Sequence, residues 1–218
     1  MKNHFKARHI FAFTLAEVLI VLAVIGVVAA MTILVLMGNY QKEQTVEKLK
    51  KEYTSLAQII KISEIDNGPY SAWDYTTGAV TIAGSKAFFD KYLAPYFSFL
   101  TTCPQGLNFT CGYPISSAGV NYSLSNGVGF SVVLQAAKTL YISIDLNGPT
   151  SPNAIGKDAF IYQITPTGGL VGMFYQKGMT RAQVIDNGIY HCNEANKHMC
   201  AALIMFDGWQ ISDDYPWQ

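Results

Sequence analysis

A run of twenty residues near the N-terminus constrains this chain more than any other feature. Residues 18–37 are all apolar or small except Thr32. A helix of this length rises about 30 Å, which matches the hydrocarbon thickness of a bilayer. A secretory signal peptide is the alternative, but its apolar core is shorter. The sequence therefore predicts a transmembrane helix.

Charged residues flank this run unequally. Lys2, Lys6 and Arg8 lie in the first twelve residues, which hold no acidic residue, whereas Lys42 follows the run with Glu43 beside it. Cytoplasmic flanks of transmembrane helices are enriched in Lys and Arg, so we expect the N-terminus in the cytoplasm and the later residues outside. The formal net charge is zero, which gives no indication of a nucleic-acid-binding surface.

The helical pattern continues beyond the apolar run. Apolar residues recur at alternating gaps of three and four, the period of an amphipathic helix. This apolar stripe consists of Val46, Leu49, Tyr53, Leu56 and Ile60. The Asp-Asn-Gly-Pro sequence at 66–69 ends the pattern. We therefore expect one helix over 13–66, transmembrane over about 13–37, whose second half is covered by a globular domain.

Glu17 stands at the start of the apolar run. A carboxylate at membrane depth is costly unless it has a partner or a role, although a position at the headgroup interface is an alternative. The surrounding residues from Ala12 to Val21 read AFTLAEVLIV. This string, after a short basic leader, resembles the prepilin cleavage and methylation motif of type IV pilins and type II secretion pseudopilins.

This resemblance implies a maturation step. A prepilin peptidase would remove residues 1–12 as a leader peptide by cutting between Ala12 and Phe13, and would methylate the new Phe13 amine. Glu17 would then neutralise the Phe13 amine of a neighbouring subunit, so that neither charge stays unpaired in an apolar helix bundle. The sequence departs from the family at Ala12, where glycine is usual, and at Leu34, where many relatives have proline.

Residues 67–218 have the pattern of an exported globular domain. Short β-branched or aromatic stretches, separated by Gly, Pro and Asn, predict antiparallel strands. These stretches are 129–134, 139–145, 159–164, 170–175 and 201–206. Ser85 is the expected cap of a short helix over 86–93. The fold class is therefore α+β, with the long N-terminal helix packed on a small antiparallel sheet, and pilin-like proteins share this layout.

Four cysteines fall into two pairs, Cys103 with Cys111 and Cys192 with Cys200, each separated by seven residues. Four cysteines allow three pairings, of which the two local bonds form the simplest pattern. Disulfides indicate an oxidising compartment, in agreement with export. The second pair lies close to His191 and His198, so a zinc site is an alternative there.

A loop between two predicted strands carries oxygen-bearing side chains that suit calcium. Asp145, Asn147 and Asp158 are the candidate ligands, and the resemblance adds that some secretion pseudopilins hold calcium in a loop of the globular domain. The spacing does not match an EF-hand. A turn with side-chain-to-backbone hydrogen bonds is the alternative. No other cofactor is expected.

The expected function is structural. The chain has no Gly-x-Ser-x-Gly, HExxH or phosphate-binding glycine motif, so we do not expect an enzyme. The resemblance implies a single-pass inner-membrane subunit of a type II secretion pseudopilus or a type IV pilus. Its partners would be copies of itself, other pilin-like subunits, the prepilin peptidase and an inner-membrane assembly platform. The alternative is a signal-anchored exported enzyme or binding protein that does not polymerise.

Overall fold

The computed structural model describes residues 14–75, 80–98, 100–167, 169–186 and 188–217. The chain divides into two compact units, Met1–Lys42 and Glu43–Gln218. The helices are α1 (Leu15–Asn67), α2 (Ile82–Tyr92), α3 (Arg181–Ile185) and α4 (Cys200–Phe206), with 3-10 turns η1 (Tyr70–Ala72), η2 (Ala94–Tyr96) and η3 (Phe109–Cys111). The strands are β1 (Leu100–Thr102), β2 (Val120–Leu124), β3 (Gly129–Gln135), β4 (Thr139–Asp145), β5 (Ala159–Thr165) and β6 (Gly169–Gly172).

The six strands form one antiparallel sheet in which spatial order follows chain order, from β1 to β6. The longest pairing joins β3 to β4, from Gly129 opposite Asp145 to Gln135 opposite Thr139. β5 pairs with β4 through Asp145 opposite Ala159, which brings the end of β4 beside the start of β5. The predicted α+β class with a long N-terminal helix and a small antiparallel sheet is therefore confirmed.

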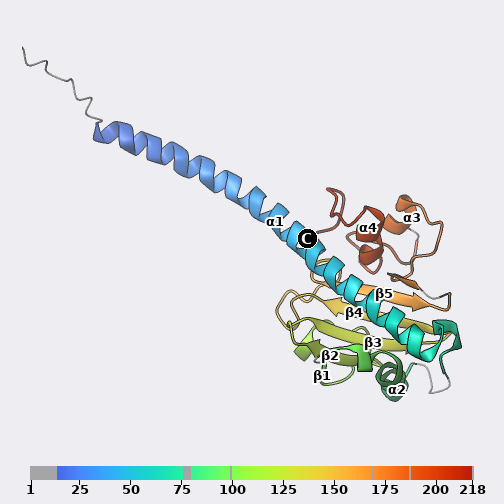
Figure 1. Cartoon of the computed structure of the whole chain (residues 1–218). Coiled ribbons are helices and arrows are strands. Elements are labelled where there is room, and N and C mark those ends of the chain that lie inside the picture. The colour runs from blue at the N-terminus through green and yellow to red at the C-terminus, as the bar shows by residue number, and fades with distance from the viewer. Residues whose placement is uncertain (1–13, 76–79, 99, 168, 187, 218) are drawn as a thin grey trace, which may run out of the picture. The chain divides into compact units, whose positions relative to one another are not determined.

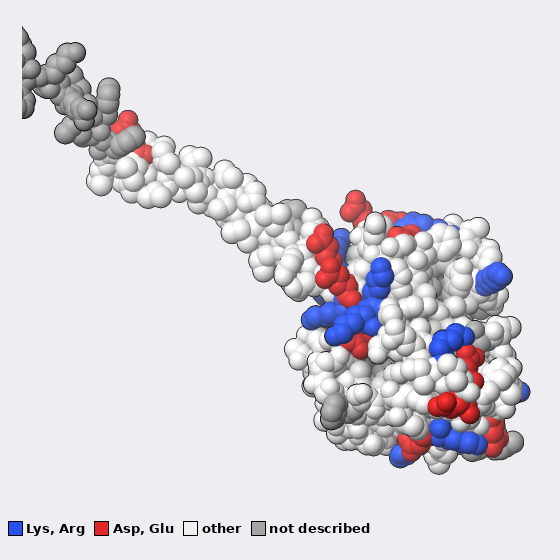
Figure 2. Space-filling view, viewed as in Figure 1, with Lys and Arg blue, Asp and Glu red and all other residues white. Residues whose placement is uncertain are grey.

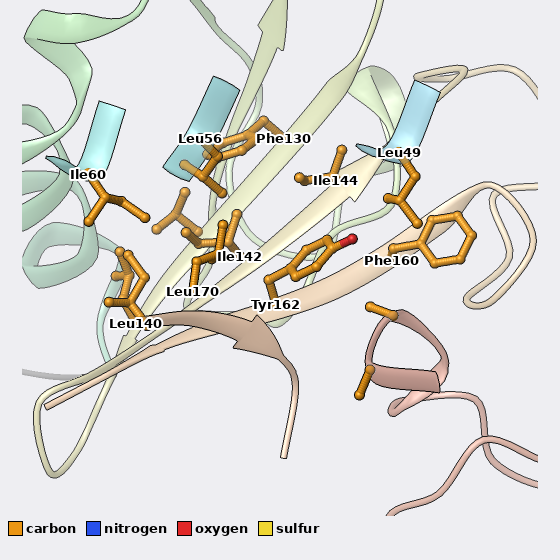
Figure 3. Close-up of a cluster of buried hydrophobic side chains, with 14 of the residues drawn as sticks. Leu49, Leu56, Ile60, Phe130, Leu140, Ile142, Ile144, Phe160, Tyr162 and Leu170 are labelled. Atoms are coloured by element: carbon orange, nitrogen blue, oxygen red, sulfur yellow. The ribbon is translucent and has the colours of Figure 1, made fainter. Parts of the chain in front are cut away.

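The second half of α1 lies across one face of this sheet (Figure 1). Figure 3 shows Leu49, Leu56 and Ile60 of the apolar stripe pointing at strand side chains. Their exposed fractions are 0%, 2% and 4%. The strand residues that meet the helix alternate along β4 and β5, as expected for one face of a sheet. They include Leu140, Ile142, Ile144, Phe160 and Tyr162.

The segment after β6 contacts the opposite face of the sheet. Phe174 donates its backbone N–H to Gln163 Oε1 at 3.1 Å, and Gln163 Nε2 donates to the Tyr175 carbonyl at 3.3 Å. The Phe174 ring also meets Tyr141 edge to face, with 5.7 Å between centroids. Because both faces are covered, β5 is buried over six consecutive residues and does not alternate between buried and exposed.

The end of α1 and the start of α2 can be compared with the predicted helix boundaries. α1 runs from Leu15 to Asn67 and so ends within the Asp-Asn-Gly-Pro sequence that was expected to stop it, one residue beyond the predicted end at 66. The prediction that Ser85 caps the next helix is wrong. Thr81 is the N-cap, because its side chain accepts a hydrogen bond from the Gly84 backbone N–H. Ser85 lies inside α2, where its hydroxyl accepts from the Leu134 N–H at 3.0 Å.

The predicted strand at 201–206 is also wrong, because these residues form α4. An apolar run of this length does not by itself distinguish a strand from a buried helix. Ala and Leu favour the helix, and Ala201, Ala202, Leu203 and Ile204 are all buried. The predicted strand at 170–175 is shorter than expected, since β6 ends at Gly172.

Two strands, β1 and β2, were not predicted. β1 has only three residues, and two of them, Thr101 and Thr102, are exposed. β2 carries the polar residue Asn121, which is buried because its side chain donates to the carbonyls of Pro104 and Gly106. Both strands are specified by pairing with distant residues and by loop contacts, which local patterns do not reveal.

We predict that Ile60→Ala lowers the free energy of unfolding by about 2–5 kcal/mol, because it leaves a cavity between α1 and the sheet. Equilibrium urea unfolding of the full chain in detergent, followed by tryptophan fluorescence, measures this loss. Ile65→Ala is the matched control, since Ile65 is on the same helix and 82% exposed, and its effect should stay within about 0.5 kcal/mol. Equal effects of the two variants would contradict the described packing.

Candidate functional site

The N-terminal part of α1 exposes apolar side chains on all sides. This apolar segment, residues 15–37, includes Leu15, Ile20 and Leu36 with exposed fractions of 79%, 65% and 66%. By length and composition, α1 is suited to cross a membrane. Figure 2 shows no charged side chain on the viewed surface of this segment beyond its N-terminal end. A water-exposed surface of this kind is unfavourable, so the apolar segment requires lipid or protein around it.

Glu17 and Thr14 form a reciprocal cap at the start of α1. Glu17 Oε2 accepts hydrogen bonds from the Thr14 backbone N–H and hydroxyl, both at 2.9 Å. The Thr14 hydroxyl accepts in turn from the Glu17 N–H at 3.2 Å. This Thr-x-x-Glu arrangement is a capping box, whose signature is present in the sequence but was not among the predicted features. The cap holds the Glu17 carboxylate beside Thr14, the residue that precedes α1.

The predicted processing residues Ala12 and Phe13 lie outside the described residues. Cleavage between them, methylation of the Phe13 amine and its pairing with Glu17 therefore remain predictions. The position of Glu17 in α1 determines which charges and hydrogen-bond donors its carboxylate favours. It stands in the first turn of α1, where the helix dipole favours negative charge, and its two oxygens accept hydrogen bonds but donate none when ionised.

The three candidate calcium ligands lie in the segment 145–158, called the 145–158 loop, which starts at the last residue of β4 and leads to β5. Asp145 and Asp158 are buried, with exposed fractions of 1% and 7%. Asp145 accepts from the backbone N–H groups of Tyr113 at 2.8 Å and Asn147 at 3.2 Å. Asp158 accepts from those of Asn153 at 2.9 Å and Ala154 at 2.6 Å. The carboxylates thus organise the backbone of the loop, as the turn alternative expects.

The same loop holds two carboxylates that interact with each other and a buried amide oxygen. Burial and the neighbouring charge of Asp158 raise the pKa of Asp145 to about 7. Within the described part of the chain, the buried Oδ1 of Asn147 has no hydrogen-bond partner. The end of the Asn153 side-chain amide lies 2.7 Å from the Gly148 carbonyl oxygen and 2.9 Å from Asp145 Oδ2. An amide nitrogen in that place donates to both oxygens.

These observations fit calcium in the chemistry of the donor set, which is all oxygen. Among the residues the structure describes, however, no group of three or more His, Cys, Asp or Glu side chains could hold a metal ion. The fit depends on the two carboxylates together with the neutral oxygen of Asn147. Calcium at Asp145, Asn147 and Asp158 therefore remains a prediction.

Both local cysteine pairs are disulfides in the structure. Cys103 bonds to Cys111 and Cys192 bonds to Cys200. The zinc alternative at the second pair is therefore wrong, because disulfide-bonded sulfurs are not the thiolates that zinc requires. The loop closed by Cys103 and Cys111 is called the first ring, and the loop closed by Cys192 and Cys200 is called the second ring.

The second ring lies beside an aromatic group. Phe174 and Tyr190 stack with 3.6 Å between centroids, and the His198 ring lies 6.0 Å from Tyr190. His198 Nδ1 is 2.8 Å from Asn196 Oδ1. Burial, followed by the charge of nearby His191, lowers the pKa of His198 below its ordinary value. His198 is thus held in its neutral form more firmly than in an unfolded chain.

Sequence reasoning missed an ion-pair network near the C-terminus. Arg181 Nε and Nη2 contact both carboxylate oxygens of Asp207, at 2.6 and 2.9 Å. Its Nη1 and Nη2 also contact Asp214, at 2.8 and 2.7 Å. Nearby, the Tyr215 hydroxyl donates to the Gly156 carbonyl at 2.6 Å. The C-terminal residues are thereby fastened to α3, α4 and the 145–158 loop.

Acidification should destabilise the protein partly through His198. Because its folded-state pKa is depressed, its contribution is complete above about pH 6.5 and is lost as the pH falls through the folded-state pKa. His198→Gln keeps a hydrogen-bonding group but does not titrate. Its unfolding free energy, measured by urea titration between about pH 5 and 7.5, should fall less on acidification than that of the wild type. Parallel pH profiles would contradict this assignment.

Comparison with known proteins gives one family match. A model described as a family of unknown function (DUF6613) matches residues 35–218. The matched region includes the apolar stripe, the whole sheet and both disulfide rings, and it starts after most of the apolar segment. No curated protein and no solved structure matches the chain.

Proposed function

The chain belongs to the family of unknown function DUF6613, and we propose that it is a pilin-like structural subunit that is anchored in the inner membrane and polymerises through α1. The observation that carries this proposal is the nature of α1, which is one continuous helix from Leu15 to Asn67. Its apolar segment is exposed all round, and its second half is built into the core of the globular domain. A helix of this kind suits both a subunit held in the membrane before assembly and the centre of a polymer.

The proposed maturation follows from the N-terminal motif. A prepilin peptidase cuts between Ala12 and Phe13 and methylates the new amine, which then meets Glu17 of a neighbouring subunit. The capping box supports this pairing, because it holds the Glu17 carboxylate at the end of α1 that adjoins residue 13. Removing the leader also removes three basic residues, which leaves Phe13 as the cation closest to Glu17 in sequence.

Polymer formation has a physical driving force once the subunit leaves the bilayer. In lipid, helices gain little from hydrophobic burial, since the surrounding tails are themselves apolar. In a water-exposed polymer the exposed side chains of the apolar segment would be buried against neighbouring helices, which is strongly favourable. The exported domains then coat the helix bundle, and the type II secretion pseudopilus and the type IV pilus are the assemblies that suit this arrangement.

The proposed location and partners follow from the same features. The N-terminus lies in the cytoplasm because Lys2, Lys6 and Arg8 precede the membrane segment. The domain lies outside, where its two disulfides are stable. The subunit would meet the prepilin peptidase and the inner-membrane assembly platform first, then copies of itself or other pilin-like subunits.

We predict that Glu17→Gln lowers incorporation into sheared fibres at least tenfold, because the buried Phe13 amine loses its counter-charge. Quantitative immunoblotting of fibre and membrane fractions measures this loss. Glu47→Gln is the matched control, since Glu47 is an exposed carboxylate further along α1. Membrane insertion should be unchanged in both. A signal-anchored protein that does not polymerise would show no fibre fraction and equal behaviour of the two variants.

The mass of the mature N-terminus tests the maturation step directly. Processed protein should begin at an N-methylated Phe13. Purified membrane protein that still begins at Met1, with no fibres containing it, would contradict the proposal and favour an uncleaved anchor for an exported enzyme or binding protein.

A second proposed property is calcium binding by the 145–158 loop. The observation in its favour is that, among the described residues, the buried Asn147 Oδ1 has no hydrogen-bond partner, in a loop that also contains two buried carboxylates. Asp145, Asn147 and Asp158 would hold the ion, and its charge would relieve the repulsion between the two carboxylates. The role of calcium here would be structural, since it would fix the loop between β4 and β5.

Calcium should raise the melting temperature of the full chain in detergent after EDTA treatment. At a concentration 100-fold above its Kd it would stabilise the folded state by about 2.7 kcal/mol, or roughly 5–10 °C for a chain of this size. Magnesium at equal concentration should have a smaller effect, because it demands a tighter octahedral site. Asp158→Asn should abolish the calcium response and Asp66→Asn, at an exposed site on α1, should keep it. No response in the wild type would contradict calcium binding.

A further inference from the structure

The sequence contains two Asn-x-Ser/Thr triplets, Asn108-Phe109-Thr110 and Asn121-Tyr122-Ser123. This triplet, with any residue except proline in the middle, is the acceptor for N-linked glycosylation in exported proteins. Because so short a pattern often arises by chance, the surroundings of each asparagine decide whether its side chain can carry a sugar. The two asparagines have opposite surroundings in the folded domain.

Asn121 is buried in β2, and its amide is fully used by the core. Its exposed fraction is 3%. Its Nδ2 donates to the carbonyls of Pro104 at 2.9 Å and Gly106 at 2.8 Å, and its Oδ1 accepts from the Ser131 hydroxyl at 2.8 Å. A sugar on Nδ2 would replace one of these amide hydrogens and leave a buried carbonyl without its donor, which is costly. The folded domain therefore excludes a glycan at Asn121.

Asn108 lies in the first ring, and its amide is oriented by the third residue of its own triplet. Asn108 Oδ1 accepts from the Thr110 backbone N–H at 2.9 Å and from the Thr110 hydroxyl. No hydrogen bond between described residues uses Asn108 Nδ2, and this nitrogen is not one of the buried polar atoms that lack a partner. Since Asn108 is partly exposed, Nδ2, the atom to which an N-linked sugar is attached, faces solvent.

The neighbours of Asn108 provide a surface that a sugar can cover. Leu107 and Phe109, on either side of it, have exposed fractions of 67% and 50%. The Phe109 ring is held edge to face against Tyr113, with 5.8 Å between centroids. A sugar ring presents C–H groups on its faces, and these pack on apolar side chains and on the electron-rich face of an aromatic ring. A glycan on Asn108 would thus shield apolar surface that otherwise meets water.

We propose that Asn108 is an N-glycosylation site of the exported domain and that the fold excludes the second triplet at Asn121. The co-substrate is an oligosaccharide linked to a polyprenyl diphosphate, which a membrane-bound oligosaccharyltransferase transfers. A bond forms between Asn108 Nδ2 and the anomeric carbon of the first sugar. The bond from that carbon to the diphosphate oxygen breaks, its electron pair leaves with the diphosphate, and Nδ2 loses one proton. The inference rests on the proposed export of the domain but not on polymer formation.

Peptide mapping by mass spectrometry tests this assignment on the full chain, purified from membranes of its native host. Fragmentation that keeps the glycan on its residue distinguishes Asn108 from Asn121. Asn108→Gln removes the acceptor, and Thr110→Ala removes the hydroxyl of the triplet. Thr110→Ser is the matched control, since it changes the same exposed position and keeps the hydroxyl.

We expect Asn108 of the wild type to be heavier by whole sugar residues. The added mass should remain in Thr110→Ser and be lost in Asn108→Gln and Thr110→Ala, while Asn121 should be unmodified in all four proteins. An unmodified Asn108 in the wild type, an added mass that survives Thr110→Ala, or a glycan on Asn121 would overturn the inference. If a variant fails to accumulate, the map of the wild type decides.

The same spectra separate this inference from the proposed function. An unmodified Asn108 on protein that begins at N-methylated Phe13 would refute glycosylation and leave the pilin-like subunit intact. A glycan on Asn108 of protein that begins at Met1 and forms no fibres would support the inference and refute the polymer.

Discussion

The packing of one helix on one sheet governs this structure. α1 buries Leu49, Leu56 and Ile60 against β4 and β5. Because α1 is one continuous helix, the same element also carries the apolar segment. The helix therefore has to meet two requirements that differ along its length. Its second half needs one apolar face and one polar face, whereas residues 18–37 need an apolar surface in every direction.

Local patterns were sufficient to predict the long helix and the centre of the sheet. The apolar run and the three-and-four spacing are properties of neighbouring residues, and residues 139–145 and 159–164 read as strands because they are β-branched and aromatic. The wrong or missing predictions concern residues whose secondary structure depends on tertiary contacts. Residues 201–206 are apolar enough for either state and become a helix because α4 packs with β5 and β6. β1 has too few residues to produce a pattern at all.

The candidate sites show the same division. Asp145, Asn147 and Asp158 were found as oxygen-bearing residues around a turn, and the pairing of β4 with β5 explains why the first and last of them meet. The N–H of Tyr113 gives no sequence signal, since every residue except proline has such a donor. Arg181 reaches partners 26 and 33 residues away, and sequence spacing on that scale carries no information about contact.

The Thr14–Glu17 cap has a consequence for reversibility. In the proposed polymer the Glu17 carboxylate meets a neighbour's ammonium group, but a free subunit has its own Thr14 amide and hydroxyl available to the same oxygens. On dissociation, the Glu17 carboxylate would exchange the neighbour's ammonium group for its own Thr14 donors. It would therefore not be left in the bilayer without a hydrogen-bond partner. A subunit released from a fibre could return to the lipid phase with its carboxylate solvated by its own backbone, ready for another round of elongation.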